Sequence, residues 1–171
     1  MDLRNILERV NRCYPVVLEL PLLFLLLVTI WHLSTHYALM PAQIPTHFGL
    51  NGIPDTWNTK SWGFALSLPV FNIISYIIFS GLTLRQLDHE TQQCKQKKTD
   101  DMLQRVTVQG LFFVKAAIVV ALSYSTYSGI QVAIGKSSGL GWLSVVLISF
   151  IVVASLVTAM RIIIVSRSDK H

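Results

Sequence analysis

The sequence predicts an all-α membrane protein, a four-helix transmembrane bundle with an ordered extracytoplasmic loop between the first and second helices. Of its 171 residues, 52% are hydrophobic and only 13% are charged, whereas a soluble domain carries about 25% charged residues. The apolar residues gather into four runs long enough to cross a bilayer, and most basic residues lie on one side of those runs. These observations exclude a soluble enzyme, a nucleic-acid-binding domain and a disordered tail.

Each apolar run is close to the ~20 residues that a helix needs to cross a hydrocarbon core about 30 Å thick. Backbone groups in lipid must satisfy their own hydrogen bonds, so we expect every run to be helical. The first run is too long for the apolar region of a signal peptide, and no small-residue cleavage site follows it, so we expect it to be retained. The predicted spans of a single membrane domain (1–171) are about 16–36, 62–84, 106–133 and 141–165.

The positions of lysine and arginine predict the orientation. Eleven of these 14 residues lie before the first run, between the second and third runs, or at the end of the fourth. Only Lys60 and Lys136 lie in the two links on the other side, and Lys115 lies inside the third run. Since cytoplasmic loops carry the excess of Lys and Arg, we expect both termini and the loop 85–105 in the cytoplasm and the loop 37–61 outside.

The two longer loops differ in composition. Prolines forbid a continuous helix in the loop 37–61, and the Asn51-Gly52 pair is typical of a tight turn. Its many apolar residues favour a compact cap folded over the end of the bundle. Thr59 or Ser61 is expected to be the N-cap residue of the next helix. The loop 85–105 has no proline or glycine, which predicts a helical hairpin with its turn near 98–100. That hairpin either touches anionic lipid head groups or docks a cytoplasmic partner.

Two charged residues lie within the predicted spans. Glu19 is about one turn into the first span and Lys115 about two and a half turns into the third, both counted from the cytoplasmic face. An ionisable group inside lipid is paired or functional. We predict a Glu19–Lys115 ion pair. The alternatives are independent snorkelling and a proton- or ion-linked site in a small transporter or transporter accessory.

Histidines give a second candidate site. His32 and His36 are four residues apart and share one helix face near the outer surface, below His47 and Asp55 in the cap. Such a set is compatible with zinc in a metal-dependent membrane enzyme, although no Glu lies between the helical histidines and no Cys is near. The simpler alternative is a pair of interfacial histidines. No phosphate-binding loop, nucleophile elbow or paired-carboxylate motif is present, so no catalytic residue and no cofactor are predicted.

The cap carries a recognisable motif. The string Ile44-Pro45-Thr46-His47-Phe48 and the residues that follow it resemble the signature I-P-x-H-F-x-x-x-G-x-P-D-x-W-x-x-K. That signature is typical of a bacterial membrane domain of unknown function found at the N-terminus of SdpI-type immunity proteins. The matched residues are His47, Phe48, Gly52, Pro54, Asp55, Trp57 and Lys60.

The resemblance implies a multi-pass protein of the bacterial cytoplasmic membrane. Immunity proteins of this type protect the producing cell from a secreted toxic peptide and hold a repressor at the membrane, and they have additional C-terminal spans. We therefore expect a non-enzymatic binding, sensing or immunity module that contacts the lipid bilayer, an extracytoplasmic peptide or envelope ligand, and a cytoplasmic regulator, without binding nucleic acid directly. His47, Asp55 and Lys60 are predicted to form a polar cluster under Trp57 that either closes the cap or contacts the ligand.

Overall fold

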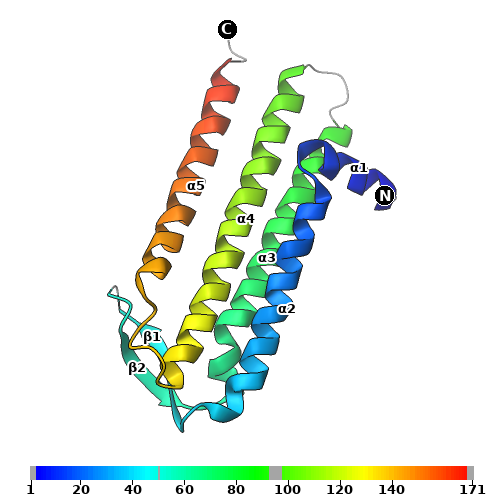
Figure 1. The fold of residues 1–171 in the computed structure, drawn as a ribbon. Helices are drawn as coiled ribbons and strands as arrows, with labels where there is room; N and C mark the ends of the chain where they lie inside the picture. The colour runs from blue at the N-terminus through cyan, green and yellow to red at the C-terminus, as the bar shows by residue number, and fades with distance from the viewer. Residues whose placement is uncertain (1–2, 50, 93–97, 169–171) are drawn as a thin grey trace.

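The computed structural model describes residues 3–49, 51–92 and 98–168. Figure 1 shows α2, α3, α4 and α5 running side by side, with both chain termini at one end of the bundle and a β-hairpin at the other. We refer to these as the terminal end and the hairpin end. In chain order the elements are α1 (Leu3–Cys13), η1 (Val16–Leu18), α2 (Glu19–His36), η2 (Tyr37–Leu39), β1 (Gln43–Phe48), β2 (Pro54–Thr59), α3 (Trp62–Gln92), α4 (Lys98–Ala133) and α5 (Trp142–Ser168).

The four predicted spans are confirmed as helical segments that are long and apolar enough to cross a membrane. They cover Val16–Leu39, Trp62–Leu87, Met102–Ala133 and Trp142–Arg167. The helices α3 and α4 also continue past these spans, as the composition of the loop 85–105 predicted. The predicted turn near residues 98–100 is wrong, because these residues are helical in α4. The segment 93–97 lies outside the described residues.

Helix α4 is the central element of the bundle. Half of its most apolar stretch is buried inside the protein, compared with 6% for α5. It packs against α2, α3 and α5, whereas α5 packs chiefly against α4. Asn72 of α3 is fully buried and donates to the Val119 carbonyl at 3.2 Å and to Ser123 Oγ at 3.1 Å. This polar contact joins α3 and α4, as amide side chains do between helices in lipid.

Two apolar clusters fill the bundle, one toward each end. Toward the terminal end, α1 contributes Val10 and Cys13 to a cluster that includes Leu87 of α3 and Phe112 of α4. Toward the hairpin end, residues of α2, β1 and α4 pack together. The buried members of this second cluster are Leu33, Met40, Ile44, Ile130 and Ala133.

The cap between α2 and α3 is a two-stranded antiparallel sheet. Gln43 pairs with Thr59 at its base and Phe48 with Pro54 near its tip, with irregular register on both sides of His47. The strands were not predicted, because Pro45 and Pro54 argue against regular strand pairing and their sequences do not alternate cleanly. The predicted turn is correct: Gly52 has φ +73°, a conformation that glycine adopts without steric cost.

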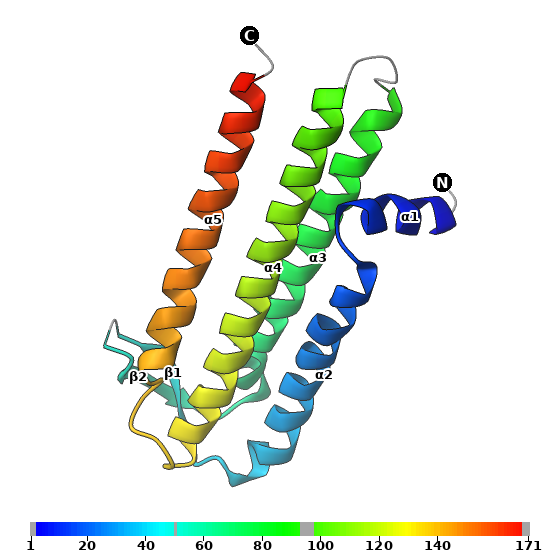
Figure 2. The same ribbon diagram turned by 45° about the horizontal axis from the view of Figure 1, so that its top comes forward.

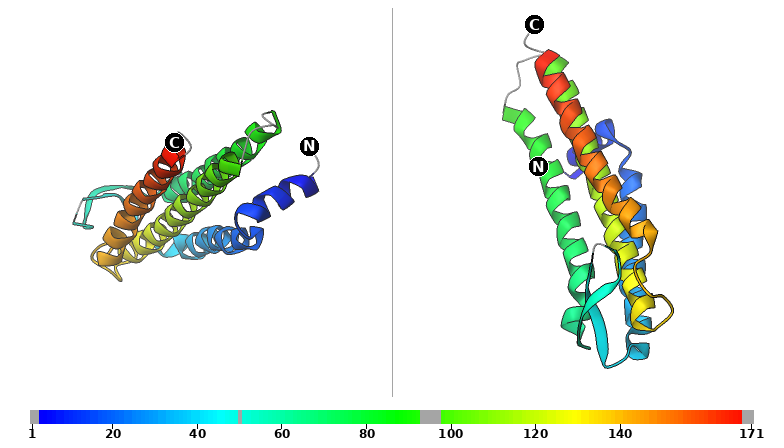
Figure 3. Two further views of the ribbon diagram at one scale, coloured as in Figure 1. Left: turned by 90° about the horizontal axis from the view of Figure 1, so that it is seen from above. Right: turned by 90° about the vertical axis from the view of Figure 1, so that its left-hand side faces the viewer.

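The amphipathic helix α1 was not predicted either. It ends at Cys13, Pro15 follows, and the chain then turns into the first span. Figures 2 and 3 show α1 leaving the bundle sideways instead of continuing the line of α2.

At the start of α3, Phe64 N donates to Ser61 Oγ at 3.3 Å, which confirms the predicted helix cap.

Candidate functional site

A groove of about 310 Å³ lies beneath the hairpin. Its walls come from β1, the start of α3, the last third of α4 and the α4–α5 link, and Figure 3 (right) shows the hairpin between α3 and the pair α4 and α5. Apolar side chains form most of the lining, among them Ile44, Phe48, Leu68 and Leu122. This volume is at the lower end of the range for small-molecule sites, about 300–1,000 Å³. The groove therefore fits a small ligand or one apolar part of a larger ligand.

A few hydroxyl groups interrupt the apolar lining. Ser67 donates to the Phe64 carbonyl at 2.7 Å and Thr126 to the Leu122 carbonyl at 2.9 Å, so both hydroxyl protons bond within their own helices. Ser125, also on α4, and Thr46 of β1 add two further hydroxyl groups. A pocket with an apolar body and few polar groups is typical of sites that bind an apolar ligand and orient it by one or two hydrogen bonds.

His47 and Asp55 meet across the hairpin. The His47 Nδ1 lies 2.6 Å from Asp55 Oδ1, and both side chains are more than half exposed. His47 also lines the groove. The hydrogen bond from the His47 ring holds the pKa of the Asp55 carboxyl below its ordinary value, and a weaker bond from Thr56 acts in the same direction. The pair places a charged carboxylate beside the groove at neutral pH.

The titration of Asp55 gives a prediction. A carboxyl whose pKa is lowered by folding stabilises the hairpin above its unfolded pKa of about 3.9, and this contribution is lost as the pH falls through the folded value. We expect His47→Ala to raise the titration midpoint of Asp55, measured by carboxyl ¹³C NMR. The matched control Thr56→Ala is expected to raise it less, and an equal response to both substitutions would contradict a leading role for His47.

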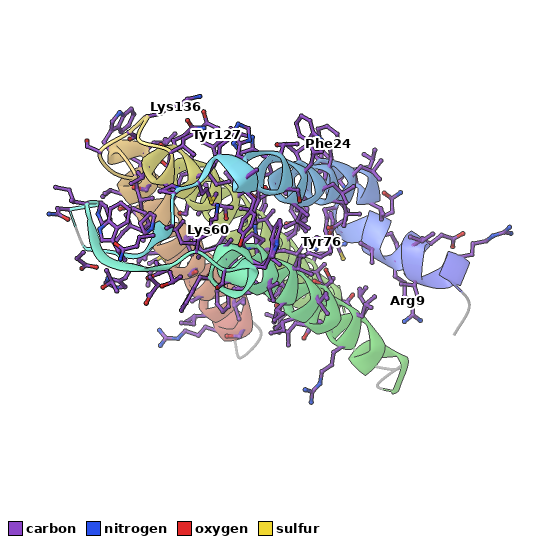
Figure 4. The ribbon with its side chains drawn as sticks, turned by 90° about the horizontal axis from the view of Figure 1, so that it is seen from below. Arg9, Phe24, Lys60, Tyr76, Tyr127 and Lys136 are labelled. Carbon is purple, nitrogen blue, oxygen red and sulfur yellow. The ribbon has the colours of Figure 1, made fainter. Side chains whose placement is uncertain are left out.

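Lys60 does not join His47 and Asp55. Its Nζ donates to the Met40 carbonyl at 2.7 Å and to the Tyr37 carbonyl at 3.5 Å, and it lies 5.2 Å from the centre of the Tyr37 ring. Figure 4 shows Lys60 among the side chains where the hairpin meets the bundle. The predicted cluster of three polar residues under Trp57 is therefore replaced by two separate contacts, one near the hairpin tip and one at its base.

Replacing Lys60 with methionine tests its role at the hairpin base. The substitution keeps the apolar stem and removes the charge-assisted bonds to two backbone carbonyls. Because the site is only half-buried, we expect a loss of about 1 kcal/mol in the free energy of unfolding. Lys136→Met, an exposed lysine in the α4–α5 link, is the control and is expected to change little. An equal loss in both variants would show that the contacts of Lys60 add nothing.

The hairpin tip is attached to the link between α4 and α5. Leu140 N donates to the Gly52 carbonyl at 2.8 Å, and a side chain at Gly139 would collide with that same carbonyl. The Leu140 carbonyl in turn accepts from Tyr124 Oη and from Ser128 Oγ, both at 3.1 Å. Hydrogen bonds thus connect the hairpin tip, the α4–α5 link and α4. Leu140 forms part of one wall of the groove.

The structure brings Glu19 and Lys115 together inside the bundle. Lys115 Nζ lies 2.6 Å from Glu19 Oε1, and the lysine side chain is only 2% exposed. Tyr14 donates to Glu19 Oε1 at 2.5 Å and Tyr76 to Oε2 at 2.9 Å, while Lys115 also donates to Ser80 Oγ at 3.3 Å. Figure 4 shows Tyr76 among the helices, in contrast to Phe24, which points outward. Among the described residues this network pairs both charges and joins α2, α3 and α4.

The four residues considered as zinc ligands form two separate pairs. The rings of His32 and His36 lie tilted against each other on α2 with centres 4.1 Å apart, and His47 pairs with Asp55 in the hairpin. Within the described parts of the chain, no group of three or more His, Cys, Asp or Glu side chains is placed to hold a metal ion. The four candidate ligands thus lie in two places, one pair on α2 and one pair in the hairpin. His32 instead lines a second, apolar groove between α2 and α4 of about 370 Å³.

The signature residues mostly build the hairpin itself. His47 and Phe48 line the groove, Gly52 forms the turn, and Pro54 begins the second strand. Trp57 lies opposite Pro45 and is 45% exposed. Sequence reasoning missed the groove, because its lining comes from segments far apart in the chain. The signals for it in the sequence were the motif residues His47 and Phe48 and the small and hydroxyl residues on one face of α4.

Comparison with known families gives one finding. A family model described as a domain of unknown function (DUF1648) matches residues 23–73, less than half of the chain. No curated protein and no solved structure matches the chain. The matched segment contains most of α2, the complete hairpin and the beginning of α3. The part of the chain that resembles a known domain of unknown function is thus the part that forms the hairpin and one wall of the groove.

Proposed function

We propose that this multi-pass membrane protein is a non-enzymatic binding module of the bacterial cytoplasmic membrane. The groove beneath the hairpin receives an apolar chain of an extracytoplasmic ligand, either from a peptide or from an envelope lipid. Receipt of a secreted peptide is the activity expected of an immunity-type or sensing module. The groove between β1, α3 and α4 is the observation that carries this proposal.

The chemistry of the groove supports an apolar ligand. Its lining is dominated by aliphatic and aromatic side chains, and the hydroxyl protons of Ser67 and Thr126 are already bonded to backbone carbonyls. The cost of removing polar atoms from water is therefore small on the protein side. His47 and Asp55 stand nearby, where they can meet a polar group attached to the chain.

The orientation is supported by the distribution of basic residues. The described basic residues near the terminal end include Arg4, Arg85, Arg105 and Arg161, and the hairpin end has Lys60 and Lys136. By the positive-inside rule this distribution supports a hairpin outside the cell and extensions of α3 and α4 in the cytoplasm, where a regulator can contact them. The resemblance of the hairpin sequence to SdpI-type immunity proteins agrees with this arrangement.

The rival functions have less support. A metal-dependent enzyme needs His32, His36, His47 and Asp55 in one place, and they form two pairs. A transporter that uses Glu19 and Lys115 needs a path to them, and neither residue lines the grooves described above. Both charges instead have several close partners, which favours a structural ion pair.

The orientation is tested first. A cysteine at Asn51, in the exposed hairpin turn, is treated with a membrane-impermeant maleimide in a background without Cys13 and Cys94. We expect labelling in intact cells. A cysteine at Arg85, at the terminal end of α3, is expected to react only after lysis. The reverse pattern would refute the proposed orientation.

Ligand binding is tested with two photoactivatable probes, a diazirine-bearing palmitate and a decapeptide of alternating photo-leucine and serine. Purified protein in nanodiscs is irradiated with each probe, and the labelled residues are found by mass spectrometry. We expect labelling in the groove that Ser125→Phe abolishes, because the added ring fills the space. Ser149→Phe, on the exposed face of α5, is the control.

The two probes distinguish the sources of the apolar chain. Groove labelling by the peptide alone indicates a peptide ligand, and labelling by the palmitate alone indicates a lipid. If Ser125→Phe leaves the labelling by both probes unchanged, the groove is not a binding site and the proposed function fails.

A further inference from the structure

We infer that α1 lies flat in the membrane surface and binds anionic lipid head groups through its arginine side chains, with its apolar face in the acyl boundary. This inference is independent of the proposed function of the hairpin. It also holds for either orientation of the protein, because it concerns only the leaflet at the terminal end.

The sequence of α1 is amphipathic. Ile6, Leu7 and Val10 follow the spacing of one helix face. The other face carries Arg4, Glu8, Asn11 and Arg12, and Glu8 is the only acidic residue within the helix. Helices with one apolar face and a polar face rich in arginine bind in the plane of a membrane surface.

The position of α1 matches that surface. The helix ends at Cys13, and the apolar span begins at Val16, so the chain between them lies at the boundary between water and lipid. Pro15 cannot continue the hydrogen bonding of α1. Figures 2 and 3 show α1 directed away from the axes of the spanning helices, as a helix that lies along the membrane surface should be.

The bundle fixes the inner end of α1. Val10 and Tyr14 are buried, and Tyr14 stacks on Phe112 with ring centres 4.4 Å apart. Gln109 Nε2 donates to the Cys13 carbonyl at 2.8 Å, and Arg9 Nη1 donates to the Leu87 carbonyl at 3.2 Å. These contacts set the rotation of α1, so its apolar face is directed toward the cluster that lies inside the spans.

The outer part of the same face extends beyond the bundle. Ile6 is half-buried, and Leu7 is 45% exposed. The bundle thus covers the apolar face at Val10 but leaves it open one turn earlier. The acyl boundary of the bilayer lies at this level and accounts for an apolar surface here. The exposed Arg4 and Arg12 then face a layer of head groups whose negative charge complements theirs.

Two adjacent positions test the immersion of α1. Nitroxide labels are placed on Leu7→Cys or Glu8→Cys in the full chain with Cys13→Ala and Cys94→Ser, in nanodiscs that contain phosphatidylglycerol. Because the residues are neighbours, the labels differ mainly in the helix face they occupy. We expect the label at position 7 to be accessible to oxygen and shielded from an aqueous nickel chelate, and the label at position 8 to show the reverse.

A second measurement tests the charge. We expect Arg4→Gln with Arg12→Gln to weaken phosphatidylglycerol binding, measured by native mass spectrometry, about fivefold for each arginine removed. Arg161→Gln with Arg167→Gln removes the same charge from α5 at the same end and is expected to have a smaller effect. Equal losses in the two variants would overturn the lipid site on α1. Equal accessibility of the labels at positions 7 and 8 to the nickel chelate would also overturn it. Dipolar broadening between labels would do the same, because it would show that a second copy of the protein covers the apolar face of α1.

Discussion

Glu19→Gln is expected to lower the free energy of unfolding by about 3–5 kcal/mol, because it leaves the Lys115 ammonium buried without its counter-ion. The two tyrosines donate to different oxygens of Glu19, and the amide of Gln keeps only one oxygen, so the loss combines the missing charge with one weakened hydrogen bond. Lys115 is 2% exposed and cannot reach water without moving α4 relative to its neighbours. The measurement is equilibrium unfolding in lipid bicelles. Glu8→Gln, on the exposed face of α1, is the control and should be close to neutral.

The double variant separates pairing from simple loss of a polar residue. Lys115→Met alone should also destabilise the protein, but less, since Tyr14 and Tyr76 still donate to the Glu19 carboxylate. Glu19→Gln combined with Lys115→Met should recover most of the stability, because replacing a complete buried pair by neutral groups is often close to neutral. Additive losses would mean that the two charges act independently.

The second large effect is expected at the contact between α4 and α5. Gly110 is buried, and even a Cβ atom there would collide with the Thr158 side chain. Gly110→Leu should therefore force α5 away from α4 and destabilise the protein by about 1–3 kcal/mol. Thermal unfolding and the distance between labels on the two helices are the measurements.

Two comparisons make this prediction specific. Thr158→Gly should restore much of the stability of Gly110→Leu, because it makes room for the new side chain. Gly81→Leu places the same side chain on α3, where a Cβ meets nothing within 4 Å, and should be neutral or slightly stabilising. If Gly110→Leu and Gly81→Leu behave alike, the close approach of α4 and α5 at Gly110 does not contribute to stability.

The sequence predicted the spanning helices to within a few residues. Hydropathy alone determines which segments can cross a bilayer, and a helix is the only regular structure that an isolated apolar segment can adopt there. The Asn51-Gly52 turn and the cap at Ser61 were also predictable, because each depends on residues close together in the chain.

The hairpin strands and the true contacts of Lys60 were not predictable in the same way. Pro45 and Pro54 hide the strand pattern, since proline lacks the N–H that a regular ladder uses. Lys60 bonds to the backbone carbonyls of Met40 and Tyr37, and a carbonyl acceptor leaves no mark in a sequence. The charged positions of α1 were interpreted only as a guide to orientation, although their spacing also contains the amphipathic pattern.

The bond from Leu140 to Gly52 has a consequence for biosynthesis. Leu140 follows α4 in the chain, so it is synthesised after α2, the hairpin and α3. The last wall of the groove is therefore added only when α5 follows α4 into the bilayer. Until then the hairpin tip lacks the hydrogen bond from Leu140, so a nascent protein arrested before Leu140 would have an incomplete groove. The groove is thus complete only after the link between α4 and α5 has been made.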